Sequence, residues 1–364
     1  MPRIFMILLA LVLAATPMTL LDAGGTVAGG ATMRGTDPAE LRETDAQRRL
    51  VVLLADNTGT ETTDLLVPHG ILKRSGVADV LIVATENGPV DLMPALTIMP
   101  DMTVSAFDAA YPRGADVVIV PAFHSRGTRA TTAFIKSQAA KGALVVAICE
   151  GAEPVARAGL FDARTATTHW YAQDRLNRRY PDTTWVQNTR YVIDGPVMSS
   201  SGVSASVPVT LKLLEILAGE ETAQATAAGL GLDDWSAEHD SSLFSLDIGK
   251  VQLAAGNLLG FWRHEVLAAP VVDGFDGIAL ALQADAWSRT YRSRLVARNP
   301  DGAVVSAEGV SFVTETGGRA DATITPSAGP PFAALDVNLA AISERYGERT
   351  AAFVAAQLEY VWRP

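Results

Sequence analysis

The chain has 364 residues, of which 48% are hydrophobic and 19% charged, and its formal net charge is −11 with an isoelectric point near 5.0. This length suffices for one large or two ordinary domains, and the hydrophobic content excludes a disordered chain. An acidic chain without a dense Lys/Arg run lacks the basic patch of nucleic-acid-binding proteins, so we expect no nucleic-acid partner.

The N-terminal segment is typical of an export signal. Arg3 precedes an unbroken apolar stretch at residues 4–15, and a glycine-rich region follows at 23–35. Because the apolar core is short for a membrane span, a cleaved signal peptide is favoured over an uncleaved membrane anchor, which remains the alternative. We assign residues 1–23 to the signal peptide or anchor and residues 24–48 to a flexible linker, and we expect a periplasmic or secreted protein.

From residue 49 onward, buried-strand patterns alternate with helical patterns. Continuous apolar runs and helical periods predict, in chain order, a strand at 50–55, a helix at 62–75, strands at 79–84 and 116–120, a helix at 131–141 and a strand at 143–148. Thr62 or Thr63 is the expected N-cap of the first helix, and Gly76 its stop. This order predicts an α/β fold, a parallel-sheet three-layer sandwich, with its site at the carboxyl ends of the strands.

The rest of the chain is less regular. Extended pieces at 183–186 and 191–193 and a helix at 203–217 complete a first domain at 49–219. We assign residues 220–364 to a C-terminal α+β region of unknown role, without an evident internal repeat. Its expected features are β-like segments at 277–297 and 303–313, a loop-rich stretch at 317–331, and two helices between 332 and 360 that are separated near Gly347.

The only cysteine, Cys149, directly follows the fourth predicted strand, and a lone cysteine excludes an intramolecular disulfide. Gly151 and Ala152 permit a sharp turn into a short helix that stops at Gly159. A thiol at such an elbow meets unsatisfied helix amides, which would lower its pKa and hold an oxyanion. The alternative is an inert buried cysteine that ends a strand, but the turn chemistry favours a reactive thiol.

The surroundings of Cys149 resemble the ThiJ/PfpI superfamily, in particular isonitrile hydratases and the domain that precedes the DNA-binding helices of AraC-type regulators. The resemblance covers about residues 50–219 and implies a flavodoxin-like, class I glutamine amidotransferase-like fold, a small-molecule substrate or ligand, and a homo-oligomer such as a dimer. The matching segments are residues 147–152, 158–162, 166–170, 191–195 and 199–202.

The resemblance also implies an acid/base at Asp64, which stands four positions before Pro68. A carboxyl beside a thiolate is pushed towards its protonated form and becomes a hydrogen-bond donor. From the residues alone, Asp64 is equally well explained as a first-turn aspartate that the helix dipole favours. Glu61 is the fallback carboxylate.

Supporting roles follow from the same resemblance. His169 matches a family histidine near the cysteine and could orient a substrate or water, although a histidine beside Trp170 is more often structural. Phe123 occupies the position of an oxyanion-hole amide. No metal-like spacing, Walker sequence or GxGxxG after a strand is present, so we expect no metal and no cofactor. His239 is expected in a surface loop.

Glu150 departs from the family pattern. PfpI-type peptidases carry histidine directly after the cysteine, so a Cys–His peptidase is not expected here. Isonitrile hydratases carry threonine at this position, and a glutamate would raise the thiol pKa unless it points away. The sequence therefore favours a cysteine-dependent hydrolase or hydratase that uses Cys149 and Asp64. The alternative is a non-catalytic redox sensor or ligand-binding protein that uses the same pocket.

Overall fold

The computed structural model describes residue 41 and residues 48–364. The predicted signal peptide and nearly all of the predicted linker lie outside the described residues. Within the described part of the chain, no helix is both long enough and apolar enough to cross a membrane.

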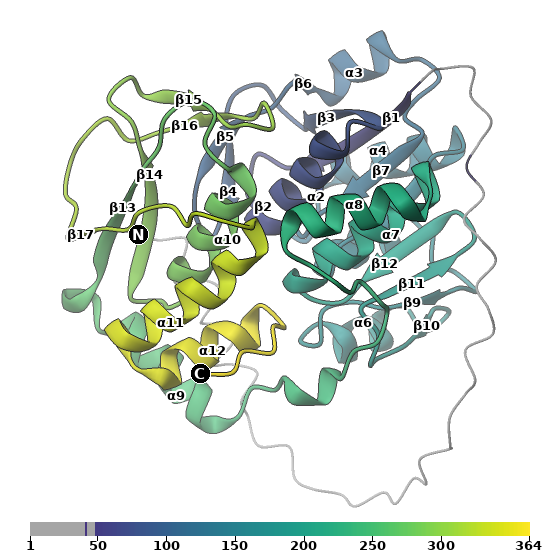
Figure 1. Ribbon diagram of the computed structural model, residues 1–364. Coiled ribbons are helices and arrows are strands. Elements are labelled where there is room, and N and C mark those ends of the chain that lie inside the picture. The colour runs from purple at the N-terminus through teal and green to yellow at the C-terminus, as the bar shows by residue number, and fades with distance from the viewer. Residues whose placement is uncertain (1–40, 42–47) are drawn as a thin grey trace, which may run out of the picture.

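A seven-stranded sheet forms the centre of the first part of the chain (Figure 1). Neighbouring strands are parallel, except that the first strand in this order is antiparallel to the second. The spatial order is β11 (Tyr191–Asp194), β12 (Val197–Ser200), β8 (Leu144–Ala147), β7 (Val117–Val120), β1 (Arg49–Ala55), β3 (Ala78–Ala84) and β6 (Met102–Thr103).

Helices cover both faces of this sheet, because alternate strand residues point to opposite sides. Val51 and Leu53 of β1 belong to one hydrophobic core, and Val52 and Leu54 belong to the other. The first core includes α2 (Thr62–Ser75) and α7 (Ser206–Ala218), against which α8 (Glu220–Leu230) packs. The second core includes α3 (Val104–Ala110), α4 (Arg129–Ala140) and α5 (Ala152–Arg157). The predicted three-layer α/β sandwich is confirmed.

The elements predicted up to residue 148 all form, and their ends differ from the predicted ones by no more than the usual one or two residues. The N-cap of α2 is a correction. Glu61 caps the helix by accepting a hydrogen bond from the amide of Asp64, whereas Thr62 and Thr63 lie inside the helix. Gly76 ends α2 with a φ of 68°, as predicted.

The β-like prediction for residues 277–297 is wrong in its first half, which forms helix α10 (Gly277–Ser288). All 12 residues of α10 are buried, so apolar residues lie on every side of it and the helix lacks the 3.6-residue period that reveals a surface helix. It packs against α2, β14 (Ser293–Arg298) and α11 (Ala334–Tyr346) (Figure 1). The two predicted C-terminal helices are α11 and α12 (Glu348–Gln357), with Gly347 between them.

One sequence of elements occurs twice in the chain. It runs strand, helix, parallel strand and antiparallel hairpin, so the expectation that the chain has no internal repeat is wrong at the level of structure. The first copy is β1, α2, β3 and the hairpin β4 (Val90–Met93)–β5 (Thr97–Met99). The second copy is β13 (Glu265–Pro270), α10, β14 and the hairpin β15 (Ala303–Val305)–β16 (Ser311–Val313).

The two copies share a sheet. Strands β5 and β16 pair antiparallel, with Phe312 opposite Ile98, and so join the two hairpins. The remaining elements include β17 (Ala322–Thr323), which pairs with β13 as β7 pairs with β1. Others are β2 (Thr60–Glu61), β9 (Thr165–Ala166), α6 (Gln173–Arg179), β10 (Thr184–Trp185) and α9 (Ile248–Leu259).

Candidate active site

Cys149 lies at the sharp turn between strand β8 and helix α5. A 3-10 turn (Cys149–Gly151) leads directly into α5. Cys149 has a φ of +58°, a left-handed conformation that costs a non-glycine residue roughly 1–2 kcal/mol. The strained turn places the thiol where the sheet gives way to a helix, which is the geometry of a nucleophile elbow.

Gly151 makes this turn possible because the backbone passes directly against the end of β7. A Cβ atom on Gly151 would collide with the carbonyl oxygen of Val120 and lie 2.8 Å from that of Pro121. Only glycine fits at this position without moving one of the two backbone segments.

The thiol of Cys149 is almost completely buried, since the residue is 6% exposed. Burial raises its pKa, and the nearby carboxylates of Asp64, Glu150 and Glu61 raise it further, whereas the hydrogen bond from the Glu150 amide lowers it. The expectation that helix amides lower this pKa is wrong in its net direction, because one amide does not offset desolvation and three acidic neighbours. The sulfur therefore rests as a neutral thiol and needs a base to become a nucleophile.

Asp64, in the first turn of α2, is the carboxylate with the largest effect on the pKa of Cys149. It is fully buried, and its Oδ2 accepts a hydrogen bond of 3.1 Å from the amide of Ala122. Its Oδ1 has no hydrogen-bond partner among the described residues. Burial and the charge of Glu61 raise the pKa of Asp64, against smaller opposite effects of Ala122 and Arg289. A carboxyl with a raised pKa can take up the thiol proton and later return it.

Glu61 orients the turn that carries Asp64. Its Oε2 accepts hydrogen bonds from the Asp64 amide at 2.5 Å and from the Thr63 hydroxyl at 3.0 Å. Its Oε1 accepts one from Arg289 at 2.7 Å. With both oxygens occupied, Glu61 is a positioning group beside Asp64.

Arg289 comes from the C-terminal part, directly after α10, and was not anticipated from the sequence. It bridges Glu61 and Asp285, with its Nε 2.7 Å from the Asp285 Oδ1. Burial lowers the pKa of Arg289, but the two carboxylates raise it by more, so the guanidinium stays charged. The C-terminal part thereby places a fixed positive charge against Glu61, which in turn holds the amide of Asp64.

The side chain of Glu150 forms an ion pair with a residue of α6. Its carboxylate pairs with Arg175 at 2.5 Å, and Arg175 also pairs with the buried Glu153. The Glu150 charge nevertheless raises the pKa of Cys149. The ion pair reduces the like-charge repulsion that the sequence suggested without abolishing it.

His169 has both ring nitrogens engaged by backbone groups. Its Nδ1 accepts a hydrogen bond from the Tyr171 amide at 3.2 Å, so the proton resides on Nε2, which lies 3.2 Å from the carbonyl oxygen of Gln357. The adjacent Trp170 donates its indole N–H to the carbonyl of Ala356. The bonds of His169 and Trp170 connect the segment that carries these residues to α12. They leave the imidazole of His169 without a free nitrogen for proton transfer.

Phe123 is buried beside β2, where it faces Thr60 in an antiparallel bridge. The flanking bonds run from Glu61 to Ala122 and from His124 to Gly59, which makes Thr60 and Phe123 a non-hydrogen-bonded pair. The Phe123 amide is therefore not used by β2.

The segment after α12 packs beside Gly202 and the ring of His169. Glu359 is 1% exposed, and its Oε1 lies 2.9 Å from the Nε2 of His239. A Cβ atom on Gly202 would collide with Glu359 and lie 2.8 Å from the His169 ring. His239 lies in a loop between the exposed residues Glu238 and Asp240, as expected, but its side chain is only 8% exposed and its ring stacks on Phe244.

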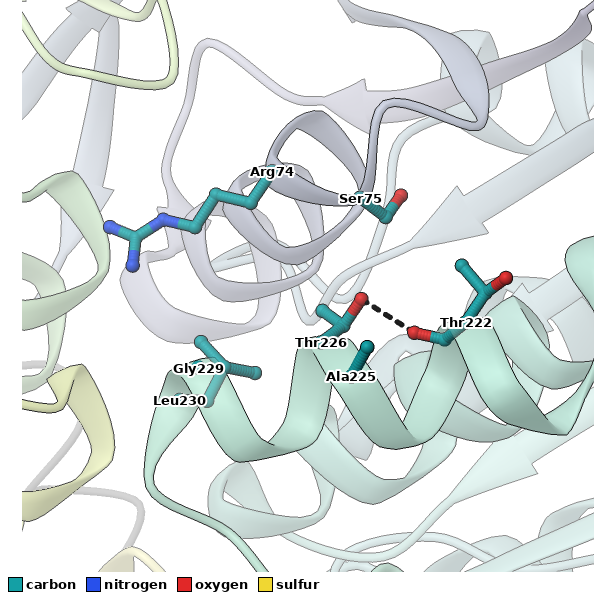
Figure 2. A pocket seen from close by; sticks show the side chains of 7 residues that line it. All are labelled: Arg74, Ser75, Thr222, Ala225, Thr226, Gly229 and Leu230. Atoms are coloured by element: carbon teal, nitrogen blue, oxygen red, sulfur yellow. Dashed lines mark hydrogen bonds between the residues drawn. The ribbon is translucent and has the colours of Figure 1, made fainter.

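A surface hollow of about 370 Å³ lies elsewhere, between the end of α2 and α8 (Figure 2). Its lining residues carry no acid, thiol or imidazole and include none of the residues around Cys149. They are Arg74, Ser75, Thr222, Ala225, Thr226, Gly229 and Leu230. We assign no chemistry to this hollow.

A family model described as the DJ-1/PfpI family matches residues 48–216. Isonitrile hydratase of Pseudomonas putida is 30% identical over 166 residues, which are 44% of this chain and 69% of that protein. The chain belongs to the DJ-1/PfpI family. The resemblance to this family and the flavodoxin-like fold are both confirmed.

Other members of the DJ-1/PfpI family match a similar share of the chain. The Parkinson disease protein 7 homolog of Danio rerio is 29% identical over 195 residues, which cover 52% of this chain and 100% of that protein. The solved structure of DJ-1beta from Drosophila melanogaster has 22% identity and a TM-score of 0.46, and it covers 51% of this chain and 100% of that one. The family match contains Cys149 and Asp64, whereas Arg289 lies beyond it.

The sequence did carry one signal for Arg289. Arg74 and Arg289 follow Glu61 and Asp276 at the same distance along the chain, and both acidic residues precede apolar helical segments. A comparison of the two copies at this spacing would have aligned the two arginines.

Proposed function

We propose that this DJ-1/PfpI-family protein is an exported, cysteine-dependent hydrolase or hydratase of small electrophiles, with Cys149 as nucleophile and Asp64 as acid/base. The observation that carries the proposal is the buried Oδ1 of Asp64, which has no partner among the described residues while Oδ2 is held by Ala122. This oxygen is available for proton exchange beside a neutral thiol.

The proposed step begins when Asp64 accepts the thiol proton and the sulfur bonds to an electrophilic carbon of a C–N multiple bond or a carbonyl. In an isonitrile the terminal carbon takes the proton from Asp64, which gives a thioimidate. In a nitrile or a carbonyl the heteroatom takes it. A water molecule then adds to the same carbon as Asp64 accepts its proton, and the C–S bond breaks as the proton returns to the sulfur. The net reaction adds water and needs no oxidant, reductant or cofactor.

Two features favour a small substrate with a C–N bond. The 6% exposure of Cys149 limits access to the sulfur, which favours a small molecule over a macromolecular substrate. The isonitrile hydratase similarity points to the same bond type.

Turnover of cyclohexyl isocyanide and of small aldehydes tests the proposal, with product detected by mass spectrometry. We expect activity towards one of these classes that disappears in Cys149→Ala and Asp64→Asn while both variants remain folded. Activity that survives in Cys149→Ala would refute a cysteine mechanism.

A thiol redox sensor is the second candidate, favoured by the raised pKa of Asp64, since a protonated carboxyl can donate a hydrogen bond to an oxidised sulfur. Peroxide would oxidise the sulfur to sulfenic and then sulfinic acid, each step releasing one water. A protonated Asp64 would donate its Oδ1 proton to the sulfinate. Intact mass after mild peroxide should then show two added oxygen atoms on Cys149, and an unchanged mass would exclude oxidation sensing.

Export is supported by the apolar stretch at residues 4–15 behind Arg3. We propose a periplasmic or secreted location, with a membrane anchor as the alternative. Cell fractionation with N-terminal sequencing of the recovered protein checks this. A soluble export fraction that begins near residue 24 supports cleavage, and recovery from the cytoplasm contradicts export.

A further inference from the structure

Helices α2 and α10 are linked by two reciprocal arginine–carboxylate contacts. α2 and α10 pack together, and each starts at an acidic N-cap that accepts the amide three residues further on, Glu61 from Asp64 and Asp276 from Ala279. Each copy also sends an arginine to the other's N-cap. Arg289 lies 2.7 Å from Glu61, and Arg74 lies 2.8 Å from Asp276.

The hairpins follow the same symmetry. Val90 pairs with Ile98 in the first hairpin, and Val304 pairs with Phe312 at the equivalent positions of the second. The strand pair that joins the hairpins sets Ile98 opposite Phe312, so equivalent residues meet each other. An interface in which each side offers the same elements to the other is the two-fold arrangement that identical subunits use.

We propose that the second copy acts as a built-in partner: it covers this face of the family domain within one chain and delivers Arg289 as a positioning residue for the Cys149 site. The expected homo-oligomer is then not needed at this face. The inference deepens the proposed function, because it rests on the same thiol site.

The two arginine contacts differ in the residues that their acidic partners affect. Glu61 accepts a hydrogen bond from the amide of Asp64, and its charge raises the pKa of Cys149. Asp276 accepts the equivalent hydrogen bond from the amide of Ala279, which stands where the first copy has Asp64. Only the Arg289 contact can therefore affect thiol chemistry, and Arg74 provides a control in the same kind of contact.

Helix α12 connects Arg289 to the segment that carries His169. The side-chain amide of Gln357 donates to the carbonyl of Arg289 at 3.0 Å, and the carbonyl of Gln357 is bonded by His169. Arg289 is held from both the interface and α12, which suits a group that must keep Glu61 in one orientation.

The test compares Arg289→Gln with Arg74→Gln, using iodoacetamide alkylation of Cys149 across pH, read by intact mass. Loss of the Arg289 charge leaves Glu61 uncompensated, so we expect alkylation at a given pH to slow by about threefold or more, a shift of about half a pKa unit. Arg289→Lys should restore the profile, and Arg74→Gln should leave it unchanged. Equal profiles for the two Gln variants would overturn the role of Arg289.

Two further measurements complete the test. If Arg289→Gln does not fold, the double variant Glu61→Gln/Arg289→Gln removes both charges and should react like Glu61→Gln alone. A double variant that is alkylated more slowly than Glu61→Gln would contradict the coupling. Mixing Cys149→Ala with Arg289→Gln chains during refolding should give the Arg289→Gln profile, and restoration of the normal profile would show that the arginine acts between chains. Alkylation needs no turnover, so these outcomes do not depend on the proposed activity.

Discussion

The guanidinium of Arg289 lies 2.7 Å from the carboxylate of Glu61, although 228 positions separate the two residues. Through Glu61 this contact reaches the amide of Asp64, and so the first turn of α2 beside Cys149. A region outside the match to the DJ-1/PfpI family model thus contributes a residue to the surroundings of Cys149.

Replacement of Asp64 by asparagine should separate thiol acidity from catalysis. Asp64 contributes to the raised pKa of Cys149, so Asp64→Asn should lower that pKa and speed alkylation at a given pH. The same change removes the proton acceptor and should abolish turnover. Slower alkylation, measured with iodoacetamide, would mean that Asp64 activates the thiol by some other route.

Glu150→Gln should shift the pKa of Cys149 in the same direction by a smaller amount, because Glu150 ranks after Asp64 among its causes and pairs with Arg175. Turnover should persist, since Glu150 takes no part in the proposed proton transfer. The matched control is Asp108→Asn, which removes a carboxylate that pairs with Lys141. A profile as strongly altered by the control as by Glu150→Gln would rule out a local charge effect.

Gly151→Ala should destabilise the protein, because the new Cβ atom would collide with the carbonyl of Val120. Overpacking of this kind costs about 1–3 kcal/mol. Gly256→Ala in α9 is the control, since nothing lies within 4 Å of its Cβ position, and it should stabilise by about 0.5–1 kcal/mol. Chemical denaturation measures both; equal stability of the Gly151→Ala protein would show that the turn can relax.

His69 should make stability depend on pH in the acid range. Burial, with Lys73 as the second cause, lowers the pKa of His69 from 6.5 to about 3. The unfolded chain binds this proton below pH 6.5 and the native chain does not, so this contribution is complete above pH 6.5 and falls as the pH drops towards about 3. The slope in that window is at most about 1.4 kcal/mol per pH unit.

His69→Leu should flatten the dependence of the unfolding free energy on pH in this window, when compared with the unmodified protein by denaturation at a series of pH values. Identical slopes for the two proteins would mean that His69 is protonated in the native state.

The sequence was sufficient for the strands of the main sheet, because fully buried parallel strands are continuous apolar runs. The turn at Cys149 was also predictable, since Gly151 and Ala152 follow the strand directly. The direction of the thiol pKa was not, because it depends on burial and on carboxylates that only the folded chain brings together.

The C-terminal part was harder to predict for a physical reason. α10 shows no helical period because every side of it is covered. Taken by itself, Arg289 is a basic residue at the C-terminal end of a helix, where such residues are common, and its neighbours in the sequence do not indicate a contact with Glu61. That contact forms through the packing of α10 on α2, and its one trace in the sequence is the equal spacing of Arg74 and Arg289 from the two acidic N-caps.

Because α10 is completely buried between the two parts of the chain, each part depends on the other for its stability. A chain cut after residue 219 would lose this helix and lay the apolar flank of α2 open to water, so the shortened protein should aggregate. For the same reason the two parts should melt together in one cooperative transition, and the intact chain should resist proteases that attack separable domains.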